Sequence, residues 1–348
     1  MSQIKKIPLT EAIGLPLAHD ITEVNPEKGF KGRAFKKGHI INKNDLEKLA
    51  AIGKNEIFIL DLDPDQTHED DAAIMMAGAF AGRYVAHDLE PKEGKINFQA
   101  QKDGLLEIEV EKLLAINLLG DTSCTTKPTH LPVKKGEVVA STRIIPLFTR
   151  KQIIEQALDI ASPKGIIRII PFTPKKAGVI VTGNEVYNGL IEDRFLPVIR
   201  RKLAQYQAEV HRSTLLPDNK DEMVASIKQF IAEGCEIIIL TGGTSVDPND
   251  VTPLAITEAG GRHFIRGVPL QPGNMFCMAW ITHDSREIPV CAVPAAALFY
   301  PHTAFDVFLP RLLSGQQPDQ TEVAALGHGG LCHFCQRCVY PVCSFGRG

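Results

Sequence analysis

The chain has 348 residues, of which 44% are hydrophobic and 23% charged, which is ordinary globular usage with room for two or three domains. The net charge of −3 and the isoelectric point near 6.4 provide no large basic field, so nucleic acid is not expected as a main partner. No apolar run approaches the roughly 18 residues of a membrane-spanning helix, and the first residues lack a secretory signal. These observations predict a cytoplasmic protein without a membrane partner.

The first 172 residues predict a separate α+β N-terminal domain. Helical periodicity runs over residues 44–52 and ends at Gly53, and residues 56–60 follow as a strand. An alanine-rich helix is predicted over residues 68–80. Residues 96–110 alternate around a Lys-Asp-Gly turn, which predicts a β-hairpin, and residues 136–147 predict a further β segment.

The run His68-Glu69-Asp70-Asp71 at the start of the alanine-rich helix has two interpretations. Imidazole and carboxylate groups are all possible metal ligands. Adjacent residues on a helix point in different directions, however, and acids in a first turn complement the helix dipole. The sequence therefore favours helix capping over a metal site.

A linker is expected at Pro171, Pro174 and the lysines after them, and regular alternation of strands and helices begins beyond it. Strands are predicted over 177–181, 209–216 and 235–240, and helices over 193–207 and 220–233. A helix starting at Thr252 has a capping hydroxyl and a proline in its first turn. This alternation predicts a three-layer αβα domain with a mostly parallel sheet over residues 173–316, and it predicts ligands at the carboxyl ends of the strands.

Two of these strands end in similar turns, Thr182-Gly183-Asn184-Glu185 and Thr241-Gly242-Gly243-Thr244-Ser245. Such turns expose backbone N–H groups where a helix is about to begin, and this geometry holds a phosphate or another anion. Two ordinary strand-to-helix turns are the alternative. The pair of adjacent glycines favours the anion site, because close packing alone rarely needs two flexible positions in a row.

These segments, together with Asp250-Val251-Thr252-Pro253 and Gln271-Pro272-Gly273-Asn274, resemble the molybdopterin-binding MoaB/Mog family over roughly residues 175–315. That family includes molybdopterin adenylyltransferases and molybdenum insertases. The resemblance implies a pterin dithiolene phosphate bound across the carboxyl edge of the sheet, with its terminal phosphate on the Thr-Gly-Gly turn. The implied cofactor-binding residues are Thr182, Gly183, Thr241, Gly242, Gly243, Thr244, Ser245, Pro272, Gly273 and Asn274.

The resemblance also implies three acids, Glu185, Asp218 and Asp250, that act near the phosphoanhydride or the metal. Carboxylates among phosphates repel them, so these acids are predicted to hold Mg²⁺ or to orient water. Helix capping is the alternative for Asp218 and Asp250. Molybdopterin or its adenylylated form and molybdate are the expected ligands, and self-association is implied by the relatives.

Two departures from the insertase pattern leave the reaction open. Residues 293–297 read Val-Pro-Ala-Ala-Ala where insertases carry Leu-Pro-Gly-Asn-Pro, and Asn274 stands in place of a lysine. Three functions follow as alternatives: adenylyl transfer or molybdenum insertion, noncatalytic carriage of molybdopterin to a client molybdoenzyme, and nucleotide hydrolysis on the same domain.

The C-terminal tail, residues 317–348, holds four of the eight cysteines within twelve positions: Cys332, Cys335, Cys338 and Cys343. Spacings of two, two and four residues allow one short loop to wrap a metal centre. The first three are spaced as in bacterial ferredoxins, but the fourth is not. An iron–sulfur cluster and Zn²⁺, with His328 or His333 as a substitute ligand, both fit, and an unstructured reduced tail is the alternative.

Overall fold

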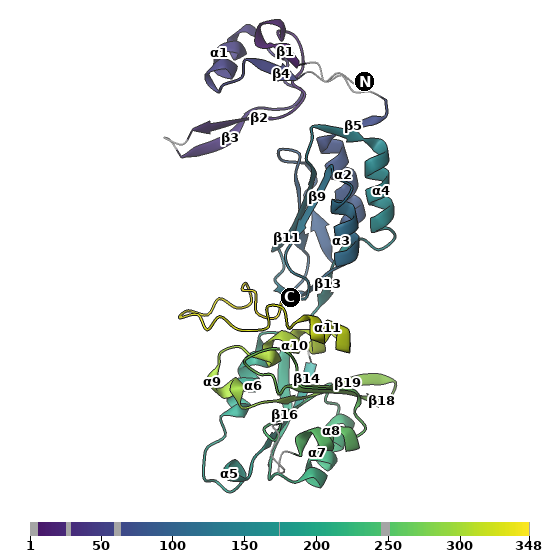
Figure 1. Cartoon of the computed structure of the whole chain (residues 1–348), viewed down its shortest axis with the longest axis vertical. Helices are drawn as coiled ribbons and strands as arrows, with labels where there is room; N and C mark the ends of the chain where they lie inside the picture. The colour runs from purple at the N-terminus through teal and green to yellow at the C-terminus, as the bar shows by residue number, and fades with distance from the viewer. Residues whose placement is uncertain (1–5, 26–28, 59–63, 174, 245–250, 348) are drawn as a thin grey trace. The chain divides into compact units, whose positions relative to one another are not determined.

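The computed structural model describes residues 6–25, 29–58, 64–173, 175–244 and 251–347. They form two compact units (Figure 1), and each unit is described by itself. Unit 1 takes in the described residues up to Gln101, then Ile108–Lys127 and Gly136–Arg168. Unit 2 takes in Lys102–Glu107, Pro128–Lys135 and the described residues from Ile169 onward. Among the described residues, no helix combines the length and the apolar character needed to cross a bilayer.

Unit 1 begins with a small lobe around a core of Leu17, Ile21 and Leu49. Its helix α1 starts at a capping box in which the Asn42 side chain accepts from the helix backbone, and it ends before Gly53 as predicted. The lobe consists of β1 (Lys6–Pro8) paired with β4 (Glu56–Phe58), the 3-10 helix η1 (Leu9–Glu11), β2 (Ile21–Asn25) paired with β3 (Phe30–Phe35), and α1 (Lys43–Ala51).

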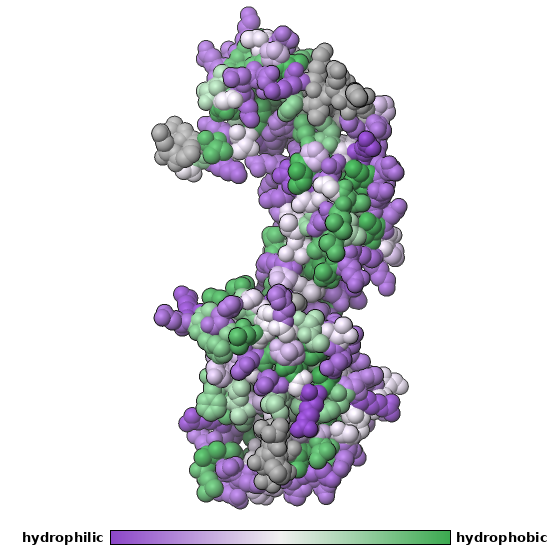
Figure 2. All heavy atoms as spheres, in the orientation of Figure 1, coloured by the Kyte–Doolittle hydropathy of each residue, from purple (hydrophilic) through white to green (hydrophobic). Residues whose placement is uncertain are grey.

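The rest of unit 1 packs three helices with an antiparallel sheet whose strand order is β6-β7-β11-β9. The helices are α2 (Glu69–Phe80), α3 (Val110–Asn117) and α4 (Lys151–Ala161), and the strands are β6 (Val85–His87), β7 (Ile96–Ala100), β9 (Thr122–Thr126) and β11 (Val138–Ile144), with β5 (Gln66–His68) paired to β12 (Phe148–Arg150). Figure 2 shows hydrophobic side chains over α3, where Val110, Leu114 and Leu118 are exposed.

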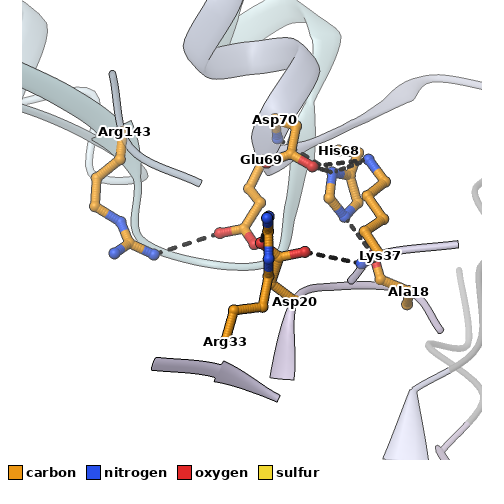
Figure 3. A network of polar contacts seen from close by, with 8 residues as sticks. All are labelled: Ala18, Asp20, Arg33, Lys37, His68, Glu69, Asp70 and Arg143. Carbon is orange, nitrogen blue, oxygen red and sulfur yellow. Dashed lines mark hydrogen bonds and ion pairs between the residues drawn. The ribbon is translucent and has the colours of Figure 1, made fainter. Parts of the chain in front are cut away.

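The His68 ring caps α2, which confirms the capping interpretation. Its Nδ1 accepts from the Asp70 amide at 3.1 Å, so the ring proton sits on Nε2, which donates to the Ala18 carbonyl at 2.7 Å. Figure 3 shows Lys37 beside both the ring and the Asp70 carboxylate. Burial, and then the Lys37 charge, lower the pKa of His68. Both ring nitrogens are engaged, which leaves none for a metal.

The predicted hairpin over residues 96–110 is wrong. Strand β7 belongs to the sheet of unit 1, whereas β8 (Gly104–Ile108) pairs with β10 (Pro132–Val133) in a separate sheet of order β10-β8-β13, with β13 at Ile167–Pro171. Leu105 of β8 is buried in the main core of unit 2. Alternation marks a strand but leaves its partner open, and here long-range burial decides the pairing.

Unit 2 is built on a six-stranded sheet of order β15-β14-β16-β19-β18-β17. Its strands are β14 (Lys175–Thr182), β15 (Ala208–Leu216), β16 (Ile237–Thr241), β17 (Arg262–Arg266), β18 (Cys277–His283) and β19 (Arg286–Val293). The first four in this order are parallel, and β18 and β17 add an antiparallel edge. Lys175 and Lys176, expected in a linker, open β14 instead.

Helices cover both faces of this sheet, which is the predicted three-layer αβα architecture. Val179 and Val181 of β14 point into one core and Ile180, between them, into the other, as the twofold repeat of a strand requires. One face packs against α6 (Phe195–Ala204), α9 (Ala296–Phe299) and α10 (Ala304–Leu313), and the other against α7 (Lys220–Ala232) and α8 (Thr252–Glu258). The short helix α11 (Gln320–Ala325) adds Val323 to the first of these cores, whereas the short helix α5 (Asn184–Tyr187) has no buried residue.

A buried ion pair joins α6 to the first turn of α10. The Lys202 ammonium contacts the Asp306 carboxylate and also donates to the Pro301 carbonyl at 2.8 Å, and both side chains are at most 6% exposed. Burial acts to raise the pKa of Asp306, but the His302 hydrogen bond and the Lys202 charge outweigh it and hold that pKa below its usual value. The charged pair is therefore part of the packed core.

Candidate ligand-binding site at the carboxyl edge of the sheet

The two Thr-Gly turns lie side by side. Val181 of β14 pairs with Thr241 of β16 in parallel register, so the turns after these strands leave the sheet at the same edge. The Thr182 hydroxyl ties them together by donating to the Thr241 carbonyl at 2.8 Å. The structure thus brings together Thr182, Gly183, Thr241, Gly242, Gly243 and Thr244.

The second turn needs both of its glycines. Gly242 and Gly243 have φ values of 84° and 58°, in the left-handed region that side chains disfavour. A Cβ atom at Gly242 would lie 2.8 Å from the Thr182 carbonyl oxygen, and one at Gly243 would lie 2.5 Å from the Thr252 hydroxyl. The backbone is therefore pressed against its neighbours, and its outer side carries no side chain at these two positions.

Several polar groups of this turn lack a protein partner. The Thr241 hydroxyl is buried, and it accepts or donates no hydrogen bond within the described part of the chain. The Gly243 and Thr244 amides also donate no hydrogen bond to a described residue, whereas the Gly242 amide donates to the Val293 carbonyl at 3.3 Å. Unpaired polar groups at a strand end are costly unless a ligand or water pairs with them, so this edge is suited to bind an anion.

Asp218 lies beside the first turn. Its carboxylate accepts from the Asn184 amide at 3.2 Å, and the Asn184 side chain accepts from the Asp218 amide at the same distance. Helix α7 is capped by Asn219, whose side chain accepts from two first-turn amides. Capping of α7 is therefore the wrong interpretation of Asp218. Its half-buried carboxylate lies at the sheet edge formed by the two Thr-Gly turns, residues 182–185 and 241–244, which we call the turn edge.

The structure describes one of the two remaining predicted acids, Glu185. Glu185 stands in the first turn of α5, one residue after Asn184, and is exposed. Asp250 and Ser245 lie outside the described residues. The structure thus places Glu185 and Asp218 next to the first turn and leaves Asp250 as a prediction.

Thr252 has a different role from the one predicted. Helix α8 has Val251 as its N-cap without a side-chain bond, and the Thr252 hydroxyl instead donates to the Gly242 carbonyl at 3.1 Å. The predicted capping hydroxyl is therefore wrong, because α8 has its N-cap at Val251, one residue before Thr252. Sequence reasoning missed this contact, and it also missed the Asn184 bond to Asp218, which joins residues 34 positions apart.

The Pro272-Gly273-Asn274 loop reaches the same edge. It precedes β18, whose first residue, Cys277, pairs with Ala292 near the carboxyl end of β19. Gly273 has φ 105°, and a Cβ there would lie 2.8 Å from the Ala304 amide, so the loop packs tightly against the start of α10. Pro272 and Gly273 are buried, and Asn274 is exposed.

The cysteine tail is ordered and packed, so the unstructured alternative is wrong. Phe345 is 2% exposed, and the Tyr340 hydroxyl donates to the Asp306 carbonyl at 2.9 Å. Cys332 and Cys343 are partly buried, Cys335 and Cys338 are exposed, and none is in a disulfide. Within the described residues, no three His, Cys, Asp or Glu side chains converge as ligands of a single metal ion.

Comparison with known proteins identifies two segments of the chain. Residues 178–314 match a family described as "Probable molybdopterin binding domain", and residues 6–61 match "Domain of unknown function (DUF8806)". The first match begins within β14, ends just after α10 and includes every described residue of the two Thr-Gly turns.

Curated relatives align with a part of the chain. A CinA-like protein of Mycobacterium sp. (strain JLS) is 31% identical over 96 residues, 28% of this chain and 23% of that protein. A molybdenum cofactor biosynthesis bifunctional protein of Synechococcus elongatus is 37% identical over 84 residues, 24% of this chain and 26% of that protein. The chain thus spans about a quarter of the length of these curated relatives.

Among solved structures, a putative molybdenum cofactor biosynthesis protein from Corynebacterium diphtheriae aligns with 42% of this chain and 100% of its own, at 20% identity and a TM-score of 0.33. The tungsten cofactor synthesizing protein MoaB from Pyrococcus furiosus aligns with 42% of this chain and 99% of its own, at 18% identity and a TM-score of 0.32. Residues 178–314 thus match a probable molybdopterin binding domain, and this chain joins that domain to an extra N-terminal region and a cysteine-rich tail.

Proposed function

We propose that the turn edge of unit 2 binds molybdopterin, with the terminal phosphate on the Thr241–Thr244 turn. The observation that carries this proposal is the set of unpaired polar groups there: the Thr241 hydroxyl and the Gly243 and Thr244 amides, all without a partner in the described ranges. Amides and a hydroxyl at the end of parallel strands are the donors that phosphate requires. The match to a molybdopterin-binding family supports the choice of ligand.

Magnesium is proposed as the counter-ion of this site. The Asp218 carboxylate is half-buried and fixed by the Asn184 amide at 3.2 Å, and Glu185 lies one residue beyond Asn184. Oxygen ligands of this kind suit Mg²⁺, which usually binds through one or two carboxylates together with phosphate oxygens. We assign Asp218, Glu185 and Asp250 to hold that ion beside the phosphate and thereby offset the repulsion between the two negative groups.

The reaction we propose is a step of molybdenum cofactor maturation on the bound pterin, either adenylyl transfer or molybdate insertion. In either step the turn fixes the phosphate while the acids manage the cation, so this chain's own contribution is positioning and charge balance. The cytoplasmic location, the self-association and a client molybdoenzyme stay predictions.

A second candidate is noncatalytic carriage of molybdopterin. Residues 293–297 favour it, because Ala295 and Ala296, at the N-cap and the first position of the short helix α9, stand where insertases carry glycine and asparagine. Methyl groups there provide no donor to a second ligand. A carrier would hold the pterin without turning over ATP or molybdate.

Titration of the full chain with molybdopterin, followed by addition of ATP, Mg²⁺ and molybdate, tests the proposal. Tight pterin binding supports the assignment, and release of AMP or an adenylylated product identifies adenylyl chemistry. Binding without turnover identifies the carrier. Absence of pterin binding by the folded chain contradicts the proposal, and nucleotide turnover without pterin would instead establish a hydrolase.

A further inference from the structure

The cysteine tail forms a loop that closes on itself and on the sheet domain. At its start, the Gln271 amide donates to the Gly330 carbonyl and the Cys332 amide donates to the Gln271 carbonyl, both at 2.8 Å. At its end, the Gly346 amide donates to the Gly329 carbonyl at 3.2 Å. Residues 330–346 thus leave and return to one place, and we call them the cysteine loop.

The cysteine loop is anchored by aromatic side chains. The Tyr340 ring stacks on His302 with 4.5 Å between centroids, and its hydroxyl reaches the Asp306 carbonyl. The Arg347 guanidinium donates to the His130 carbonyl at 3.0 Å, within unit 2. These contacts fix the loop's frame, although the segment between Cys332 and Tyr340 contains no helix or strand.

All four loop cysteines line one cavity of about 230 Å³. The other lining residues are largely aromatic or apolar, and they include Phe334, Val339 and Phe345. His333 also lines the cavity, but its Nε2 pairs with the Ser344 hydroxyl at 2.9 Å. Four thiols and an apolar wall therefore surround a single space.

We propose that this cavity holds a [4Fe–4S] cluster ligated by Cys332, Cys335, Cys338 and Cys343. Iron–sulfur clusters take four cysteine thiolates, and three cysteines spaced by two residues are typical of the run that binds one cubane. Cys343 completes the set, because the loop returns it to the wall that the first three cysteines line.

Zinc is the competing occupant of the four thiolates. Tetrahedral Zn²⁺ with Zn–S bonds of ~2.3 Å holds its sulfurs within about 4 Å of one another, whereas a cubane cluster takes up volume of its own between them. The four thiols line a space of about 230 Å³, and this volume favours the cluster.

The sulfur of one proposed ligand, Cys332, accepts a backbone hydrogen bond. The Phe334 amide lies 3.4 Å from Cys332 Sγ and donates to it. Donors of this kind stabilise thiolate sulfur and tune the potential of a bound cluster. Cys335 and Cys338 are exposed, so the cluster would be open to solvent and to exchange with a donor.

Loading is a ligand exchange without a change of oxidation state. A preformed [4Fe–4S]²⁺ cluster with four small thiolate ligands exchanges them for the four cysteines. Each cysteine thiol passes its proton to one leaving thiolate and forms one Fe–S bond, so atoms and electrons balance.

The test uses the full chain under anaerobic conditions, incubated with such a thiolate-ligated cluster and then desalted. About four iron and four sulfide per chain are expected in the wild type. The double variant Cys335→Ala, Cys338→Ala is expected to lose the bound iron. These two side chains are exposed, so the thermal unfolding of the two cluster-free proteins should coincide.

Cys235→Ala is the matched control, because Cys235 is buried in unit 2 and does not line the cavity. It is expected to retain the full iron content. Three results overturn the proposal: a folded wild type that keeps no iron, iron retention unchanged in the double variant, or one zinc per chain that competes successfully with the cluster. Pterin binding is not measured in this experiment, so its outcome is independent of the proposed function.

Discussion

The turn edge and the cysteine loop, both in unit 2, present two ways of building a site. The turn edge rests on parallel strands whose register is fixed by Val181 and Thr241, and its donors are backbone groups. The cysteine loop has no such frame between Cys332 and Tyr340, and its chemistry lies in side chains around an open cavity.

The two sites differ in what fixes the positions of their binding groups. A strand end is held by the core on both faces of the sheet, so its amides keep their positions whether or not a ligand is bound. In the cysteine loop, the buried Phe345 and the Tyr340 contacts fix the end of the loop, whereas the exposed segment around Cys335 and Cys338 gains order from the group it binds. We therefore expect the turn edge to tolerate loss of its ligand and that exposed segment to depend on its ligand.

The largest expected effect comes from removing the Lys202–Asp306 ion pair at the start of α10, because both regions contact this part of the helix. Gly273 packs on the start of α10, and Tyr340 is bonded to Asp306 of the same helix. Lys202→Met removes the partner of the buried Asp306 carboxylate, which should cost about 3–5 kcal/mol of unfolding free energy. Chemical denaturation measures it, and a cost below about 1 kcal/mol would show that the pair is not buried as described.

The same variant should reverse the pH dependence of stability. In the wild type, Asp306 has a lowered pKa, so its contribution is present above the ordinary value of 3.8 and is lost as pH falls further. Without Lys202, burial should dominate and raise that pKa, so acidification should then stabilise the variant relative to neutral pH. Unfolding curves at several pH values above 4 distinguish the two slopes.

The next effect should fall on the cysteine loop. A Cβ at Gly330 would lie 2.1 Å from the Pro269 carbonyl oxygen, so Gly330→Ala should displace the start of the loop and cost about 1–3 kcal/mol. Iron content after loading should fall, while pterin binding stays near the wild-type value. Gly78→Ala in α2, where the new Cβ meets nothing within 4 Å, is the matched control.

At the turn edge, Gly243→Ala combines a φ of 58° with a contact of 2.5 Å to the Thr252 hydroxyl. It should cost about 1–3 kcal/mol of stability and weaken pterin binding about tenfold or more. Gly234→Ala is the control, because its φ is 89° but its Cβ meets nothing within 4 Å at the far end of β16. The control should lose stability only; equal pterin loss in both variants would count against the turn.

The smallest expected effects distinguish the role of the Asp218 charge from that of the helix cap at Asn219. Asp218→Asn keeps an acceptor for the Asn184 amide but removes the charge, so stability should change by a few tenths of a kcal/mol while Mg²⁺-dependent pterin binding weakens. Asn219→Ala removes the α7 cap and should cost about 1 kcal/mol with no effect on Mg²⁺. Isothermal titration with and without Mg²⁺ compares them, and an Mg²⁺ effect in Asn219→Ala alone would reverse the assignment.

The sequence predicted local features well and long-range contacts poorly. Periodicity located α7 and its end near Gly234, because burial of one helix face leaves a repeat in the sequence. The partner of β8 was missed because it lies more than twenty residues further along the chain, and the acceptor of the Thr252 hydroxyl was missed because it depends on how the glycine turn folds back on α8. The cysteine spacing predicted a metal centre, whereas only the structure showed the four thiols around one cavity.

The most direct test of the central claim is a crystal structure of the chain with molybdopterin bound. The account predicts the terminal phosphate within hydrogen-bonding distance of the Gly243 and Thr244 amides, with a cation between that phosphate and Asp218. A pterin bound elsewhere on unit 2, with the turn edge occupied only by water, would contradict it.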